Sequence, residues 1–247
     1  MTNLLFPTDF TTHTTAALDW VRLFARKTGA TVTLLHVYQP MLPDSTLPTV
    51  GDPGLGGNPG LGVTAAHDLE VISRERLYEL AMGLSAEGFS VQTEWRVGST
   101  EDEILDAARQ YSADLIVMGR SDLSTFFDRL AGSAVTDVTA EAVCPVLIVP
   151  SPTEGQAVRP AQVRTITYVM QAKTTQADVT AQTDSLVDAF DAQLLVQTEE
   201  QLDHTMADLF VMQLYPQSGL DSLLHPNRAA KLIEQSDVPV LVYHTPK

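Results

Sequence analysis

Two patterns of apolar and polar positions alternate along the first 150 residues. Short apolar runs predict five strands, in the segments "NLLFPT", "ATVTLLHVY", "SVQTEWRV", "ADLIVMG" and "CPVLIVP" (3–8, 30–38, 90–97, 113–119 and 144–150). Between them, apolar residues recur every three or four positions and predict four helices, which span 12–29, 64–88, a segment that begins at Thr100, and 133–143. Strands that alternate with helices in this way predict an α/β fold class, a doubly wound, five-stranded parallel sheet of Rossmann-like type.

The segment 39–63 interrupts this alternation because it is rich in proline and glycine and carries almost no charge. We expect no helix or central strand in it. It is either a lid over a ligand or a tolerated insertion. The helix predicted after it places five apolar residues on its inner side, namely Leu69, Ile72, Leu77, Leu80 and Leu84.

The second half of the chain repeats part of the first. With a constant offset of 94, residues 113–150 align with 207–244 without a gap, and ten of the 38 aligned positions are identical. Such self-similarity indicates an internal duplication. The second copy has a strand near "TITYVM", a helix over 176–190 and a strand "QLLVQ", but about one β-α unit is missing. We therefore predict a domain at 1–150, a linker at 151–163 and a smaller copy of the same fold at 164–247 that packs against the first.

Charge and composition limit the classes of partner. The chain has 15 Lys and Arg against 31 Asp and Glu, a formal net charge of −16, which disfavours binding to nucleic acid or an anionic membrane. Cys144 is the single cysteine, so no internal disulfide is possible, and its apolar surroundings predict an inert thiol. No apolar run is long enough to span a membrane and no targeting segment is evident, so we expect a cytoplasmic protein.

Candidate binding residues fall where strands of the predicted sheet end. Ligands of open parallel sheets bind beyond the carboxyl ends of the strands. Asp9, Val37 and Gly119 follow or end three of them. Asp9 could accept hydrogen bonds from a ribose or an adenine amine, or it could simply stabilise a local turn. The pair Gly132 and Ser133 begins a helix, whose free N–H groups suit an anion, although the same pair is also an ordinary helix start.

Taken together, "LLFPTDFTTHTTAALDWV", "LLHVY" and "ADLIVMG…GS…CPVLIVP" resemble the universal stress protein family, in its tandem two-domain form with a degenerate, shortened second domain. The resemblance implies an adenine nucleotide alpha hydrolase-like fold that binds ATP or a related nucleotide, with or without Mg²⁺. In nucleotide-binding members the phosphate loop reads Gly, two residues, Gly, nine residues, Gly, then Ser or Thr. Gly119 and the pair Gly132 and Ser133 match that spacing, Asp9 matches the family aspartate and Val37 the adenine contact.

The second glycine of that loop is replaced by Asp122, which puts a carboxylate where a phosphate would lie. Arg120 nearby could neutralise this carboxylate or hold a phosphate itself. In the second copy every element is replaced: Gln171, Gln213, Pro216, Pro226 and Asn227 stand at the corresponding positions. The resemblance therefore implies a nucleotide-responsive stress protein whose N-terminal domain binds the ligand. The alternative is a scaffold or interaction member that binds no nucleotide, and slow ATP hydrolysis is a third, weaker reading.

Other chemistry is not indicated. The six histidines have no metal-ligand spacing, and no catalytic residues or metal site are predicted. The strands "CPVLIVP" and "VPVLVYH" would each lie at the edge of their own sheet, so we predict that they pair and bring Val146 close to Val240. Two such chains would then form a homo-oligomer, most simply a dimer, that meets a protein partner of unknown identity.

Overall fold

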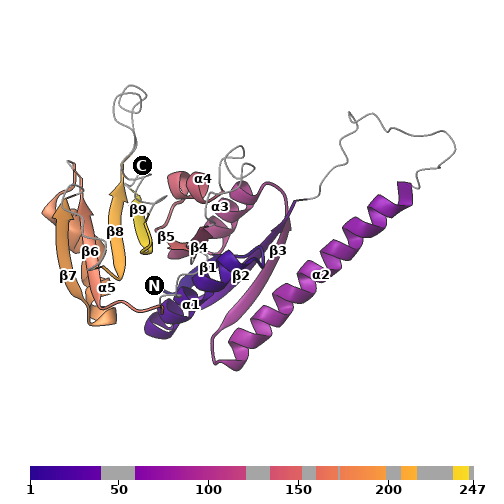
Figure 1. Cartoon of the computed structure of the whole chain (residues 1–247), viewed down its shortest axis with the longest axis horizontal. Coiled ribbons are helices and arrows are strands. Elements are labelled where there is room, and N and C mark those ends of the chain that lie inside the picture. The colour runs from indigo at the N-terminus through magenta and orange to yellow at the C-terminus, as the bar shows by residue number, and fades with distance from the viewer. Residues whose placement is uncertain are drawn as a thin grey trace, which may run out of the picture.

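The computed structural model describes residues 1–39, 59–120, 134–151, 160–171, 173–198, 207–215 and 236–244. It contains β1 (Asn3–Pro7), α1 (Thr12–Thr28), β2 (Thr31–Tyr38), α2 (Pro59–Ala86), β3 (Val91–Val97), α3 (Thr100–Gln110), β4 (Leu115–Arg120), α4 (Ala134–Glu141), β5 (Val146–Pro150), β6 (Thr165–Met170), α5 (Gln176–Phe190), β7 (Gln193–Thr198), β8 (Leu209–Leu214) and β9 (Val240–His244). The strands form one sheet in the order β3-β2-β1-β4-β5-β9-β8-β6-β7 (Figure 1).

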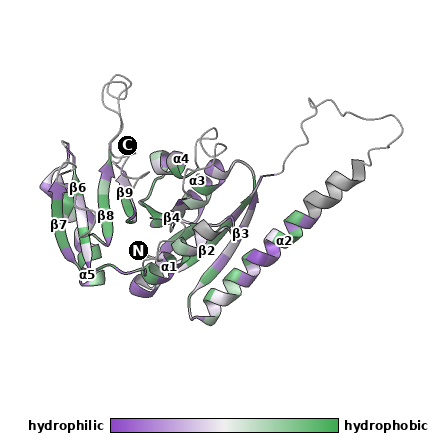
Figure 2. Cartoon of the chain, viewed as in Figure 1, coloured by the Kyte–Doolittle hydropathy of each residue, from purple (hydrophilic) through white to green (hydrophobic). Residues whose placement is uncertain are grey.

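The first five strands form the predicted parallel, doubly wound arrangement. All four strand pairings within this group are parallel. Buried residues of α1 and α2 pack in one apolar cluster on one face of the sheet, and those of α3 and α4 pack in a second cluster on the other. Hydrophobic residues are concentrated along the strands, as Figure 2 shows. Burial on both faces explains why β1, β4 and β5 read as continuous apolar runs. The edge strand β3 has no buried residue and keeps polar residues along its length.

The described strands of the second half repeat the order of the first. The order β9-β8-β6-β7 corresponds to β5-β4-β1-β2, and α5 covers the same face as α1. No counterpart of β3 occurs in the ranges that the structure describes, so β7 forms the outer edge. The four strands described in the second half therefore extend the sheet of the first half.

Two aspartates separated by the offset of 94 show the repeat at atomic detail. Asp114 Oδ2 accepts the backbone N–H groups of residues 2 and 3, at the start of β1. Asp208 Oδ2 accepts those of residues 164 and 165 at the start of β6, at 2.9 and 3.0 Å. The hydrogen bonds, first of all that from the backbone of Thr2, hold the pKa of Asp114 below its usual value. The repeated aspartate thus fixes the first strand of each half and is not a binding residue.

Strands β5 and β9 join the two halves at the centre of the sheet. They pair in antiparallel fashion, with Val146 opposite Val242, and Ile148 opposite Val240. The predicted contact between the two apolar strands is thus confirmed. Each strand is the edge of its own half, and pairing turns both into central strands. A dimer of two chains would have to use another surface, because this edge is already occupied within the chain.

The start of α2 differs from the sequence expectation. The helix begins at Pro59, inside the segment 39–63 where we predicted none, and residues 40–58 lie outside the described part of the chain. Proline is well suited to the first position of a helix, since its φ angle is already helical and its missing N–H would have no partner there. The question of a lid over 40–58 stays a prediction.

The buried face of α2 is also shorter than predicted. Leu77 and Leu84 are buried and Leu80 is partly buried, but Leu69 and Ile72 are 58% and 44% exposed. A helix of 28 residues is about 42 Å long, whereas a strand of seven residues such as β3 spans about 23 Å. The sheet cannot cover the whole helix, and Figure 1 shows the N-terminal part of α2 extending beyond it.

Two glycines on helices should respond to alanine in opposite ways. Gly29 ends α1 with φ +70°, and Gly83 lies inside α2 in the right-handed region; an added Cβ would meet no atom within 4 Å at either. We expect Gly29→Ala to lower the free energy of unfolding by about 1 kcal/mol, because left-handed backbone is strained for alanine. Gly83→Ala should raise it by about 0.5–1 kcal/mol. Urea denaturation of both variants measures these changes. If both substitutions shift the free energy of unfolding in the same direction, the prediction is wrong.

Candidate functional site

The candidate site lies at the carboxyl ends of β2, β1 and β4, three neighbouring strands. The chain winds outward from β1 to β2 and β3, and then returns to β4 on the other side of β1. The crevice of a doubly wound sheet forms at this reversal. Asp9 follows β1, Val37 lies near the end of β2 and Gly119 near the end of β4, so the topology brings three predicted residues to one edge.

Asp9 stabilises the turn between β1 and α1. Its Oδ1 accepts the backbone N–H of Thr11 at 3.0 Å and the Thr11 hydroxyl at 2.7 Å. Thr11 precedes the first turn of α1, but its side chain makes no capping hydrogen bond. The side chain of Asp9 is exposed, and its other oxygen has no partner in the described ranges. The local role that the sequence left open is therefore present, with one oxygen left over for a ligand.

Phe10 gives this turn an unusual backbone. Its φ is +62°, in the left-handed region that a bulky side chain rarely adopts. Its amide donates to the Thr8 hydroxyl at 3.1 Å, and its ring packs against His36 with ring centroids 4.7 Å apart. Strained residues of this kind cluster at ligand sites. No sequence signal marks Phe10, because periodicity and spacing carry no information about the sign of φ.

His36 holds the turn against β2. Its Nδ1 lies 2.8 Å from the carbonyl oxygen of Thr8. A carbonyl only accepts hydrogen bonds, so Nδ1 carries the proton and donates it. Together with its contact to the Phe10 ring, this hydrogen bond accounts for His36 at the rim of the sheet. It positions the β1–α1 turn and is half-buried rather than open to a ligand.

Val37 and Gly119 border the crevice in different ways. Val37 is partly buried and packs against the apolar cluster on the α3 and α4 side of the sheet. Gly119 pairs with Val149 as a regular residue of β4, and it is not among the glycines with positive φ. Its contribution is the absence of a side chain at the strand end. Asp122, Gly132 and Ser133 lie outside the described residues.

Arg120 reaches the second half of the chain. Its Nη2 donates to the carbonyl oxygen of Ser236 at 2.9 Å, and its own carbonyl accepts the hydroxyl of Ser151 at 2.8 Å. The guanidinium therefore joins the end of β4 to the segment that precedes β9. This is a structural role that sequence reasoning missed. A contact of Arg120 with phosphate stays a prediction.

The corresponding position of the second half is filled by its own side chains. Gln213, the counterpart of Gly119, is only 4% exposed. Its Oε1 accepts from Gln182 Nε2 at 3.0 Å and from the hydroxyl of Tyr215 at 3.3 Å. Tyr168 donates to Gln182 Oε1 at 2.9 Å, and burial raises the pKa of Tyr168. These hydrogen-bonded side chains therefore fill the space between α5 and the carboxyl end of β8.

Other reactive or binding features are few among the described residues. Cys144 is buried, and burial raises the pKa of its thiol to about 12, so the thiolate that would react is scarce at neutral pH. In the same ranges, no three His, Cys, Asp or Glu side chains gather in a way that could hold a metal ion. The helices of this part of the chain are all too short or too polar to cross a membrane.

Known proteins with similar sequences are universal stress proteins. The family model described as "Universal stress protein family" matches residues 1–150. The chain is similar to universal stress protein MJ0531 of Methanocaldococcus jannaschii, with 32% identity over 102 residues that cover 38% of this chain and 60% of that protein. It is also similar to the universal stress protein in the QAH/OAS sulfhydrylase 3′ region of Thermus aquaticus, with 29% identity over 59% of this chain and 96% of that protein.

A solved structure extends the likeness in fold to the whole chain. A universal stress protein from Archaeoglobus fulgidus superposes with a TM-score of 0.66, covering 99% of this chain and 97% of that one at 18% identity. At this identity the match concerns the fold. It includes the second half, which the family model does not match.

Proposed function

Since the chain belongs to the universal stress protein family, whose model matches residues 1–150, we propose that its N-terminal half binds one adenine nucleotide, such as ATP, and that occupancy alters its contacts with a partner protein. The observation that carries this proposal is the meeting of Asp9, Val37 and Gly119 at one reversal of the sheet. Gly119 also lies at the family's phosphate-loop spacing from Gly132 and Ser133.

Each residue has a role that its chemistry allows. The unpaired oxygen of Asp9 accepts a hydrogen bond from a ribose hydroxyl or the adenine amine. Val37 offers an apolar surface for the base. Gly119 and Gly132 leave the backbone open to phosphate, and Ser133 donates its hydroxyl at the helix start, where the dipole favours an anion. Mg²⁺ would neutralise part of the phosphate charge. We assign no catalytic step to the described residues of this site.

The second half does not take part in nucleotide binding. Gln213 stands where glycine is required, and its hydrogen bonds to Gln182 and Tyr215 would have to break before a ligand could enter. We assign this half to the sheet and to contacts with partner proteins. We further propose the division of the chain into 1–150, a linker at 151–163 and 164–247, and a dimer of such chains through a surface other than the β5 and β9 edges.

A second candidate function rests on Asp122. A carboxylate in the phosphate loop disfavours polyphosphate, so a member of the family that works as a scaffold, without nucleotide, fits this residue better. A direct measurement of whether the protein carries or binds adenine nucleotide distinguishes the two functions.

The test is the stoichiometry of ATP binding. Purified protein is denatured and the supernatant assayed for adenine nucleotide, and nucleotide-free protein is then titrated with ATP and with cAMP by calorimetry. We expect one site per chain. Ser133→Ala should weaken binding about 10-fold or more, the usual loss for a hydrogen bond to a charged group. The matched control is Ser85→Ala, on the exposed side of α2. Two sites per chain, or none, would contradict the proposal.

A further inference from the structure

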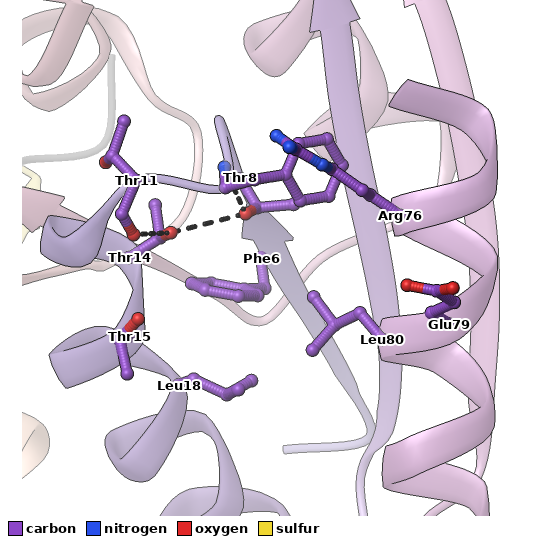
Figure 3. Close-up of a pocket in the computed structure, with 10 residues that line it drawn as sticks. Phe6, Thr8, Thr11, Thr14, Thr15, Leu18, Arg76, Glu79 and Leu80 are labelled. Atoms are coloured by element: carbon purple, nitrogen blue, oxygen red, sulfur yellow. Dashed lines mark hydrogen bonds between the residues drawn. The ribbon is translucent and has the colours of Figure 1, made fainter. Parts of the chain in front are cut away.

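A cavity of about 410 Å³ lies between α1 and α2, beside the turn that follows β1. Figure 3 shows α1 on one side of it and α2 on the other, with the end of β1 between them. It lies on the α1 and α2 face of the sheet, whereas Val37 packs toward the opposite face. Its volume falls in the range of small-molecule sites. Thr8, Phe10 and Thr11 of the turn around Asp9 border the cavity, but Asp9, Val37 and Gly119 are not among the residues that line it.

The floor of the cavity is apolar. Phe6 is 1% exposed and Leu18 is 9% exposed, and Leu80 packs against the same cluster. The Thr8 hydroxyl in this floor accepts the amide of Phe10 and donates to Thr14, so it has no hydrogen bond left to satisfy. The floor thus suits an apolar group of a ligand.

Two opposite charges stand on the α2 wall above this floor. Arg76 and Glu79 both line the cavity, since a spacing of three residues places them on one side of a helix. Figure 3 shows Arg76 extended toward Thr8 and Glu79 lying beside Leu80. Neither forms an ion pair within the described ranges, although Arg74 pairs with Glu70 at 3.0 Å in the turn before. The helix thus presents a cation and an anion at the mouth of the cavity, and neither has an ion-pair partner in the described part of the chain.

We propose that this cavity binds a hydrophobic amino acid. The ligand's carboxylate lies on the Arg76 guanidinium, its ammonium on the Glu79 carboxylate, and its side chain on Phe6 and Leu18. A single zwitterion matches both charges without leaving either unpaired, which neither an anion nor a cation does. A nucleotide is disfavoured here, because its phosphates would be repelled by Glu79. The inference concerns residues other than those of the nucleotide site and does not rest on the proposed function.

The test uses the full chain with L-leucine and L-phenylalanine as probes, titrated by calorimetry and followed by amide chemical shifts. We expect saturable binding at one site, with shifts at Thr8, Thr14 and Leu80. Arg76→Gln and Glu79→Gln should each weaken binding at least 10-fold. The matched controls are Arg74→Gln and Glu75→Gln, which remove the same charges from α2 outside the cavity and should leave the affinity within twofold.

Two further comparisons make the result decisive. 3-Phenylpropanoate lacks the ammonium and phenethylamine lacks the carboxylate, so both should bind at least 10-fold more weakly than L-phenylalanine. Thr15→Trp, on the α1 wall, should fill the cavity and abolish binding without changing a charge. The proposal is wrong if folded wild-type protein binds neither amino acid, if the charge variants bind as wild type, or if 3-phenylpropanoate binds as well as L-phenylalanine. Loss of ATP binding alone would leave it standing.

Discussion

Asp122→Gly should tighten the binding of ATP by as much as about a thousandfold. Two unit charges about 4 Å apart repel by roughly 4 kcal/mol at an effective dielectric of 20, and each 1.4 kcal/mol is about tenfold in affinity. The substitution also restores the glycine that the family loop has at this position. Calorimetric titration with ATP and with AMP measures the effect, which should be larger for ATP because it carries more negative charge.

Asp191→Gly is the matched control for this variant. Asp191 ends α5 in the second half with φ +52°, a conformation that glycine adopts without strain, and its loss removes the same charge. It should leave the affinity for ATP within about twofold, since a charge remote from the site is screened by salt. If Asp122→Gly binds no more tightly than this control, the carboxylate does not face the phosphates. If neither variant nor wild type binds ATP, the nucleotide function is lost altogether.

Leu241→Asp should destabilise the whole chain. Leu241 is 1% exposed in β9 and pairs with Leu147 of β5 on one side and Val211 of β8 on the other. A buried charge without a partner costs several kcal/mol, a large part of the 5–15 kcal/mol that stabilises a typical protein. For a chain of this length we expect the melting temperature to fall by about 10 °C or more. Thermal denaturation followed by circular dichroism measures the change.

The control for Leu241→Asp places the same residue on an exposed strand. Val196 lies on the outer strand β7 and is 42% exposed. Val196→Asp should cost no more than about 1 kcal/mol, the span of strand preferences. If the two variants melt alike, β5 and β9 do not hold the halves together as the sheet indicates. Phe24 of α1 and Phe190 of α5, with ring centroids 5.0 Å apart, form a second contact between the halves. In that case this contact would be the one that holds the halves together.

The local pattern of apolar and polar residues was sufficient to predict most helices and strands of the first half. Strands buried on both faces must be apolar throughout, so β4 and β5 are recognisable without any contact information. The end of α1 at Gly29 could also be predicted, because a glycine after an amphipathic segment takes the left-handed conformation that ends a helix. Prediction was wrong for the start of α2 and for how much of this helix is buried. How much of a helix is covered depends on the length of the neighbouring strands, which no window of residues contains.

The candidate site also contains features that could be predicted from the sequence and features that could not. The positions of Asp9, Val37 and Gly119 could be predicted because parallel strands place their carboxyl ends at one edge. The backbone of Phe10, the bond from Arg120 to Ser236 and the network around Gln213 could not, since each depends on a neighbour far away in the sequence or on a backbone angle. The cavity at Arg76 and Glu79 belongs to this second group, because its walls come from helices separated by a whole β-strand.

The fold class, the family and the repeat at an offset of 94 could all be recognised from the amino-acid sequence alone, as could the spacing between Gly119 and Gly132. These properties follow from short-range periodicity and from residue identity at fixed separations, which survive without coordinates. The pairing of β5 with β9 was predicted as well, but its antiparallel direction and register were established by the folded structure. The same holds for the side chains of Gln213 and its partners, which fill the second strand end. The reason is physical: the pairing of distant strands and the filling of a cavity depend on which surfaces meet, and that is settled only when the chain is folded.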